Sequence, residues 1–261
     1  MENVDKALIR SLRGNNNCEY ASIPSQGSSG GIITMWNGGH VIMEEVLLGD
    51  FSLSMRFRNT KDGFIWPFTS VYGASDPADY AQFWQELADI RAIIFEPWCI
   101  GGDWNVILCQ ADRNRVGGNK RNRKKFRHFI NSQNLLDIPV EGGRFNWTNS
   151  QSSPLLQRID RFFMSTEWED RCPGLVQTRL KRPISDHAPI LLSCYGGLKI
   201  FIKKLSRENF GSLQAEQDRL ENLIDVMDSL EEINGLSQDE FAERENFRLQ
   251  HKTASPNLAR K

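Results

Sequence analysis

Short apolar runs separated by glycine-rich turns fill residues 30–59 and constrain the fold more than any other feature of the chain (GGIITMWNGGHVIMEEVLLGDFSLSMRFRN). Side chains of a β-strand alternate between two faces, and glycine supplies the positive backbone angles that tight hairpin turns need. The pattern therefore predicts antiparallel strands joined by hairpins. Residues 15–31 are polar and rich in glycine and serine, which predicts a loop before these strands.

Helix and strand patterns alternate through the next part of the chain. Residues 64–74 predict a strand, and Pro67 within it suggests an edge strand or a break. Apolar residues between Asp79 and Ile94 recur at helical spacing. Further strands are expected at residues 98–108, 142–149, 157–165 and 187–195, and a helix with Phe126, Phe129 and Ile130 facing inward is expected at residues 120–138. This interleaving predicts a layered α/β sandwich.

The pattern becomes helical after Gly197. Apolar residues fall near heptad spacing at Leu213, Leu220, Leu223, Met227 and Leu230. Gly235 is a suitable helix stop, and residues 237–240 form a capping box for a second helix. We therefore expect a helical hairpin outside the sandwich core. The expected parts are a domain at residues 1–197, a helical linker at 198–250 and a disordered tail at 251–261.

The composition excludes several classes of protein. With 39% hydrophobic and 25% charged residues, the chain resembles an ordinary globular protein. No apolar run approaches the roughly 18 residues of a membrane helix, and the N-terminus lacks the apolar region of a secretory signal. Five cysteines are scattered without a C-x-x-C pair, which predicts buried thiols in a reducing compartment. We expect an intracellular protein, in the nucleus or cytoplasm, that does not bind membranes.

The net charge of -1 conceals an asymmetry along the chain. Residues 208–245 hold 12 acidic and 2 basic side chains, whereas residues 1–207 hold 26 basic and 21 acidic ones. A mildly basic body suits a partner rich in phosphate. Between Arg113 and Arg127 there are eight cations and no acid, which predicts either a grip on DNA phosphates or a solvated surface. These eight are Arg113, Arg115, Lys120, Arg121, Arg123, Lys124, Lys125 and Arg127.

Three polar motifs stand at the ends of expected strands. In Gly102-Asp103-Trp104-Asn105, a carboxylate and a carboxamide two residues apart on a strand would point the same way and could hold a metal, a water or a phosphate oxygen. Read alone, the same motif is a common turn. In the second motif, Arg158 and Asp160 share one face of a strand, and Ile159 and Arg161 share the other.

The third motif is Ser185-Asp186-His187, followed by Ala-Pro-Ile. Neighbouring Asp and His side chains do not easily bond to each other, but each can reach a different partner at the edge of a sheet. Asp186 or Asp160 could orient His187 and raise its pKa. Read alone, the motif is a solvated loop. Three such motifs, each at a strand end, together favour a catalytic site.

The segments GGDWN, RFNWTN, QRIDRFF and SDHAPI, in this order, resemble the endonuclease/exonuclease/phosphatase superfamily, which is DNase I-like and AP-endonuclease-like. SSGGIITMW, VYGA and VGG narrow the resemblance to the endonuclease domain of plant LINE-type non-LTR retrotransposons. The segment KKLSRENFGSLQAE is similar to the linker that joins that domain to a reverse transcriptase. The resemblance runs from about residue 4 to residue 250.

The resemblance implies a four-layer α/β sandwich that hydrolyses DNA phosphodiester bonds with Mg²⁺ and no small-molecule cofactor. Asp103 and Asn105 would hold the attacking water and a phosphate oxygen, and Tyr72 would bond to phosphate. Asp160 would belong to the same site. Asp186 would bind the metal or support His187, and His187 would stabilise charge in the transition state.

One part of the family pattern is not present in these 261 residues. The family begins with a strand bearing an Asn and a second strand ending in Gln-Glu-(Ser/Thr), whose Glu is the principal metal ligand. Residues 1–5 correspond to the positions after that Glu, and Glu2 and Asp5 are not taken as ligands. We therefore expect a sandwich without its first strands, with weak or lost activity.

Two other functions remain open from the sequence. A non-catalytic retroelement remnant would at most bind nucleic acid through residues 113–127. A phosphatase of the same fold would act on a small phosphorylated substrate. Trp147 is assigned to the core rather than to a DNA groove, and the other six tryptophans are assigned to packing (Trp36, Trp66, Trp84, Trp98, Trp104 and Trp168).

Overall fold

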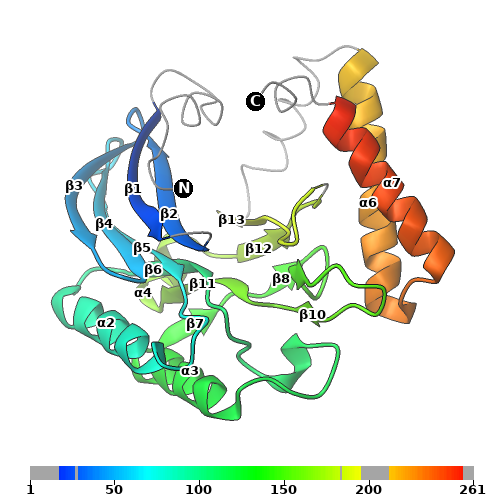
Figure 1. The fold of residues 1–261 in the computed structure, drawn as a ribbon. Helices are drawn as coiled ribbons and strands as arrows, with labels where there is room; N and C mark the ends of the chain where they lie inside the picture. The colour runs from blue at the N-terminus through cyan, green and yellow to red at the C-terminus, as the bar shows by residue number, and fades with distance from the viewer. Residues whose placement is uncertain (1–17, 27–28, 183, 195–211, 255–261) are drawn as a thin grey trace. The chain divides into compact units, whose positions relative to one another are not determined.

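A computed structural model describes residues 18–26, 29–182, 184–194 and 212–254 (Figure 1). The chain forms two compact units that are interleaved in sequence. The first unit contains the residues up to Leu108, Gly118–Asp137 and Asp160–Arg171. The second unit contains Cys109–Gly117, Ile138–Ile159 and the residues from Cys172 onward. Glu2 and Asp5 lie outside the described residues.

The first unit is built on a six-stranded sheet with the order β3-β4-β5-β6-β11-β7. Neighbouring strands are antiparallel except β5 and β6, which are parallel. The strands are β3 (Val41–Leu48), β4 (Ser52–Asn59), β5 (Ile65–Tyr72), β6 (Cys99–Asp103), β7 (Leu135–Asp137) and β11 (Asp160–Ser165). The hairpin expected within residues 30–59 is confirmed for β3 and β4. Residues 29–37 are a strand as expected, but they pair with the strand before them and not with β3.

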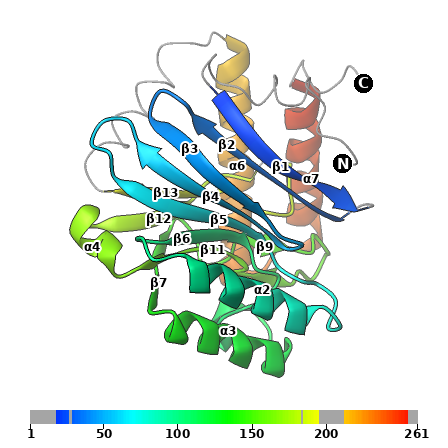
Figure 2. The ribbon, with the colours of Figure 1, turned by 90° about the vertical axis from the view of Figure 1, so that its left-hand side faces the viewer.

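Helices α2 (Tyr80–Ile93) and α3 (Lys120–Ser132) lie along one face of the six-stranded sheet (Figure 2). A short helix, α4 (Glu167–Arg171), follows β11. The other face of β4 and β5 is covered by a two-stranded antiparallel sheet of β1 (Cys18–Gln26) and β2 (Ser29–Asn37). Ile32 of β2 packs there against Leu53, Met55 and Phe57 of β4.

The loop predicted for residues 15–31 is wrong over its described part, because β1 and the start of β2 occupy it. Ile23 pairs with Ile32 and Tyr20 with Met35 in the antiparallel register. The side chains of β1 are mostly half-buried or exposed, so this strand tolerates a polar composition and needs no apolar run. Pairing with the apolar strand β2 makes it a strand.

The edge or break suggested by Pro67 is also wrong, because β5 is an interior strand of its sheet. Pairing with β6 begins only at Phe68, so the proline precedes that ladder and removes no hydrogen bond from it. The predicted helix at residues 120–138 ends early as well. Asn134 adopts a left-handed backbone angle of 48° that stops α3, and β7 follows.

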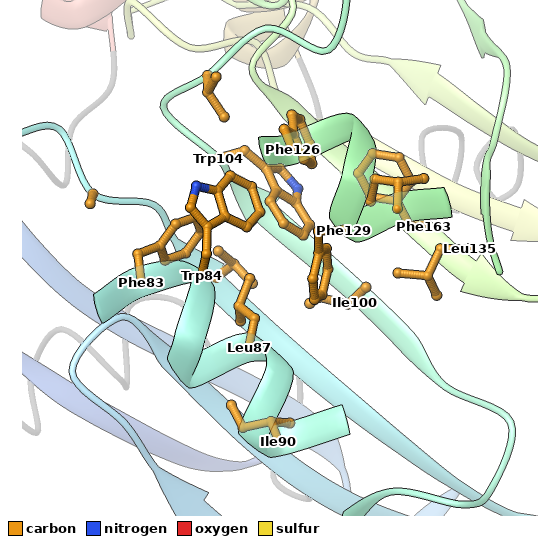
Figure 3. Packing of buried hydrophobic residues seen from close by; sticks show 14 of the residues in the cluster. Phe83, Trp84, Leu87, Ile90, Ile100, Trp104, Phe126, Phe129, Leu135 and Phe163 are labelled. Atoms are coloured by element: carbon orange, nitrogen blue, oxygen red, sulfur yellow. The ribbon is translucent and has the colours of Figure 1, made fainter. Parts of the chain in front are cut away.

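Aromatic rings from both helices fill the core of the first unit (Figure 3). Trp104 stacks on Phe126 of α3 with ring centroids 4.7 Å apart and meets Phe163 of β11 edge-on at 5.2 Å. Trp84 of α2 donates a hydrogen bond of 2.7 Å to the side chain of Asn122. The inward positions predicted for α3 are confirmed, since Phe126, Phe129 and Ile130 are buried.

The second unit contains two small sheets and two long helices. Strands β13 (Ile190–Cys194), β12 (Leu175–Arg179) and β8 (Val140–Glu141) form one sheet in that order, and β9 (Trp147–Thr148) pairs with β10 (Leu156–Gln157). A 3-10 turn, η1, covers Gln110–Asp112. Helices α6 (Ser212–Asn234) and α7 (Gln238–Ala254) pack against each other as a hairpin.

The expected capping box of α7 is present: the amide of Ser237 donates to the Glu240 carboxylate at 2.8 Å, and the amide of Glu240 donates back to Oγ of Ser237 at 3.3 Å. The helix runs to Ala254, so the predicted start of a disordered tail at residue 251 is too early. The heptad expectation is only partly met. Leu220 is buried, but Leu230 is 38% exposed, and charged side chains are buried between the helices instead.

The cysteines differ from the expectation of buried free thiols. Cys172 and Cys194 form a disulfide that links the two ends of the β12–β13 hairpin. Cys18, Cys99 and Cys109 are free, and of these only Cys99 is buried, which raises the pKa of its thiol. The partners of the disulfide are 22 residues apart, and no local spacing in the sequence marks them. Within the described residues, no helix is long and apolar enough to cross a membrane.

Candidate active site

Three of the expected site residues lie side by side on adjacent strands of the first unit. Asp103 ends β6 and is paired with Tyr72 at the end of β5 and with Asp160 at the start of β11. Residues paired across a sheet project to the same face, so these three side chains form one row. Strand pairing thus brings together Tyr72, Asp103 and Asp160, which come from three separate segments of the chain.

Asp103 and Asp160 bring two carboxylates together. A carboxylate oxygen of one lies within 4.8 Å of a carboxylate oxygen of the other. Both side chains are half-buried, which strengthens the repulsion between them relative to open water. Directly opposed like charges destabilise a sheet, whereas a divalent cation between the two would reverse that cost. The donor set, two hard oxygen atoms at this spacing, suits Mg²⁺ or a related ion.

The opposite face of β11 carries Arg161, as the alternation along the strand predicted. Its side chain is 1% exposed, and its Nη1 donates to the Asp137 carboxylate of β7 at 2.6 Å. The indole Nε1 of Trp104 donates to the Arg161 carbonyl at 3.2 Å, which ties the turn after β6 to β11. Arg161 is therefore a structural ion-pair residue that holds β11 in register.

The turn after β6 is shaped by Asn105 and Gly73. Asn105 has a left-handed φ of 51°, its amide donates to Asp103 Oδ1 at 2.9 Å, and its side-chain Nδ2 donates to the Gly73 carbonyl at 2.8 Å. The amide of Gly73 donates to the Asp103 carbonyl at 2.7 Å. A Cβ at Gly73 would lie 2.2 Å from the carbonyl oxygen of Trp104, so this approach requires glycine.

The sequence predicted that Asn105 and Asp103 lie on the same strand, and this prediction is wrong. The strand ends at Asp103, and the turn folds Asn105 back onto it. One result is preserved: the carboxylate and the carboxamide remain neighbours. Because the amide nitrogen is used by Gly73, the carboxamide oxygen is the atom suited to a ligand. Tyr72, beside this turn, borders a hollow of about 500 Å³.

Asp186 and His187 belong to the second unit, where they adjoin β9. The amide of Thr148 donates to the Asp186 carbonyl at 3.0 Å, and the amide of Ala188 donates to the Asn146 carbonyl at 2.7 Å. An isolated bridge pairs Trp147 with His187. Asp186 is exposed and His187 is half-buried. The segment is thus held like a short strand beside β9.

The assignment of Trp147 to the core is wrong. Its ring is half-buried, its Nε1 donates to Asp186 Oδ2 at 3.2 Å, and it meets the His187 ring with centroids 6.4 Å apart. Asp186 therefore has Trp147 as a partner, consistent with the expectation that adjacent Asp and His reach different groups. Trp147 is recognised as a neighbour of His187 only because its segment pairs with the histidine motif. No local pattern in the sequence signals that pairing.

The eight cations between Arg113 and Arg127 are divided between the two units. Arg113 and Arg115 belong to the second unit, where Arg115 bonds to the Ser153 side chain at 2.7 Å. The other six lie on α3, in the first unit. Five of these are exposed, opposite the buried aromatic face, and Arg123 is half-buried. We call the five exposed cations the α3 basic face (Lys120, Arg121, Lys124, Lys125 and Arg127).

The sequence model of the Endonuclease/Exonuclease/phosphatase family matches residues 8–187. This chain belongs to that family. The matched segment contains Tyr72, Asp103 and Asp160 and ends at His187. A search of curated proteins finds no significant match.

Solved structures of nucleases and phosphatases share the fold. The endonuclease domain of TRAS1, a telomere-specific non-LTR retrotransposon, is 11% identical, with a TM-score of 0.53 over 70% of this chain and 82% of that one. AP endonuclease LMAP from Leishmania major is 17% identical, with a TM-score of 0.54 over 74% and 75%. The 3' phosphatase NExo (D146N) from Neisseria, bound to product DNA hairpin, is 15% identical, with a TM-score of 0.55 over 73% and 82%. The α/β fold with a C-terminal helical region is DNase I-like, as expected.

Asp160→Asn tests whether the acid pair is a cation site. Without added metal the variant loses the like charge opposite Asp103, and its stability should change by no more than about 1 kcal/mol. Millimolar Mg²⁺ should raise the melting temperature of the wild-type protein through binding to the folded state, and this rise should largely disappear in the variant. Calorimetry with and without Mg²⁺ measures both effects.

Asp170→Asn on α4 is the matched control, because it removes an exposed carboxylate elsewhere in the first unit. It should keep the full Mg²⁺-dependent rise. An undiminished rise in Asp160→Asn would show that the cation binds somewhere other than the pair.

Proposed function

We propose that this chain carries the catalytic site of a Mg²⁺-dependent DNA endonuclease of the non-LTR retroelement type. Family membership supports phosphodiester hydrolysis as the class of reaction. The observation that carries the proposal is the placement of Asp103 and Asp160 directly opposite each other on β6 and β11. The two acidic positions that the motifs marked as catalytic are neighbours, although a long stretch of chain separates them.

The residues have distinct proposed roles. Asp103 and Asp160 would hold Mg²⁺, which supplies charge stabilisation to a phosphate when bound. Asn105 and Tyr72 would orient phosphate oxygens and the attacking water from the same edge of the sheet. His187, with Asp186 and Trp147 beside it, would contribute a hydrogen bond to charge that develops on the phosphate oxygen.

We further propose that turnover by residues 1–261 is weak or lost. These residues contain no Gln-Glu-(Ser/Thr) segment, and its Glu is the principal metal ligand in the resembling domains. A hard divalent cation gains most of its affinity from the number and charge of its oxygen ligands. Two aspartates should therefore bind Mg²⁺ less tightly than a site with an additional glutamate.

The α3 basic face supports DNA as the partner. Five exposed cations on one helical face can contact the sugar-phosphate backbone without reading the sequence. This surface would bind DNA whether or not the site turns over, so binding through α3 is also what a non-catalytic remnant would retain. A phosphatase acting on a small substrate would not need it.

Plasmid nicking separates these possibilities. We expect no measurable conversion of supercoiled to open-circular plasmid by the purified chain at millimolar Mg²⁺. Clear nicking that disappears in His187→Ala would contradict the expected loss and show that another carboxylate replaces the glutamate. Release of phosphate from a small phosphomonoester without any nicking would favour a phosphatase instead.

DNA affinity tests the α3 basic face. The double variant Lys124→Ala/Lys125→Ala should weaken binding to DNA duplexes of any sequence. The slope of log K against log salt concentration should fall by about 1 for each phosphate that the helix no longer neutralises. Fluorescence anisotropy at several salt concentrations measures this, with the exposed Lys61→Ala as the control. Equal effects of the two changes would indicate non-localised electrostatic attraction and no binding through α3.

A further inference from the structure

Arg182 connects helix α6 to the segment that bears Asp186 and His187. Its Nε and Nη2 donate to Oδ2 of Asp228 at 3.2 and 2.9 Å, and its Nη1 donates to the Asp186 carbonyl at 3.1 Å. The arginine is 3% exposed and Asp228 is 1% exposed. One planar guanidinium thus spans a buried carboxylate on α6 and the backbone of the motif, a geometry that its fixed fork of donors permits.

Asp228 is itself held in place from several sides. Arg244 and Arg248 of α7 donate to its Oδ1 at 3.1 and 3.3 Å, and Arg179 of β12 lies 3.8 Å from its Oδ2. A buried carboxylate is costly without such partners, so α6 cannot shift without breaking several ion pairs. Asp228 therefore offers Arg182 a fixed anchor.

The Asp186 carbonyl is the point where two restraints meet. It accepts the amide of Thr148 from β9 and the guanidinium of Arg182. On its other side the segment is less constrained, because a hollow of about 460 Å³ separates Ser185 and Asp186 from Arg248 and Lys252 of α7. The segment is therefore held by hydrogen bonds to its backbone more than by packing against the helix.

We propose that Arg182 is a positioning residue for Asp186 and His187, and that Asp228 fixes it. The helical hairpin, which the sequence suggested to be a linker outside the sandwich, thereby sets the geometry of the motif. This inference rests on the proposed function only in the importance it gives to His187. Removal of the Arg182 hydrogen bond should release the Asp186 carbonyl, which directly precedes His187, and loosen the Trp147–Asp186 bond.

Arg182→Lys is the most informative variant. Lysine keeps the buried positive charge beside Asp228, but a single ammonium cannot span Asp228 and the Asp186 carbonyl in the same way. We expect amide hydrogen exchange of Thr148 to become about tenfold faster, which corresponds to the loss of one hydrogen bond. The indole N–H resonance of Trp147, assigned with Trp147→Phe, should shift as well, because it reports the bond to Asp186.

Glu231→Gln is the control within the same network. Glu231 is also buried and pairs with Arg244 at 2.8 Å, and this ion pair includes neither Arg182 nor a residue of the motif. The Glu231→Gln variant should change the overall stability of the protein. The Trp147 resonance should stay unaltered, and so should the exchange rate of Thr148 relative to the other amides of the second unit. Asp228→Asn is a second test variant and should reproduce the Arg182→Lys signature if it folds.

Two results would overturn the proposal. In the first, the Trp147 resonance and the Thr148 exchange rate stay unchanged in Arg182→Lys. In the second, amide exchange accelerates equally across the second unit, which is what a purely structural role of Arg182 would give. Both readouts are independent of cleavage and of Mg²⁺. A failure of cation binding at Asp103 and Asp160 would therefore refute the proposed function without altering this outcome.

Discussion

The opposition of Asp103 and Asp160 across β6 and β11 is the constraint on which the first unit's chemistry depends. Two half-buried carboxylates directly opposite each other on neighbouring strands repel each other, and this repulsion opposes the pairing of the strands. The surrounding structure nevertheless holds them together: the buried Arg161–Asp137 ion pair and the Trp104 indole fix β11 against its neighbours. The aromatic core and this ion pair thus hold two acidic side chains close together, an arrangement that is characteristic of functional sites.

Much of this could be predicted from the sequence, because it depends on local patterns. The strands of residues 30–59, the helix from Tyr80 and the inward face of α3 follow from periodicity in a few consecutive residues. The motifs marked Asp103 and Asp160 individually, whereas their direct opposition on β6 and β11 is seen only in the strand pairing. Features that depend on distant partners could not be predicted: β1 becomes a strand through β2, and Trp147 joins the histidine motif through a pairing that no local pattern signals.

The helical hairpin shows the same limit in charged residues. The sequence predicted a hairpin outside the sandwich core with apolar residues near heptad spacing, and Asp and Glu are rarely buried unless paired. In the structure, Asp228 and Glu231 are buried because arginines from β12, the following loop and α7 converge on them. Heptad spacing of leucines contains no information about such partners. The disulfide between Cys172 and Cys194 escapes prediction for a related reason, since only the β12–β13 pairing brings its members together.

Anomalous diffraction from crystals grown with Mn²⁺ tests the central claim most directly, because it locates the ion without requiring turnover. Mn²⁺ shares the preference of Mg²⁺ for oxygen ligands and gives an anomalous signal. The account predicts a peak bonded to carboxylate oxygens of both Asp103 and Asp160, which disappears in Asp160→Asn crystals. A peak bound elsewhere, or a well-ordered pair without any peak at millimolar Mn²⁺, would contradict it.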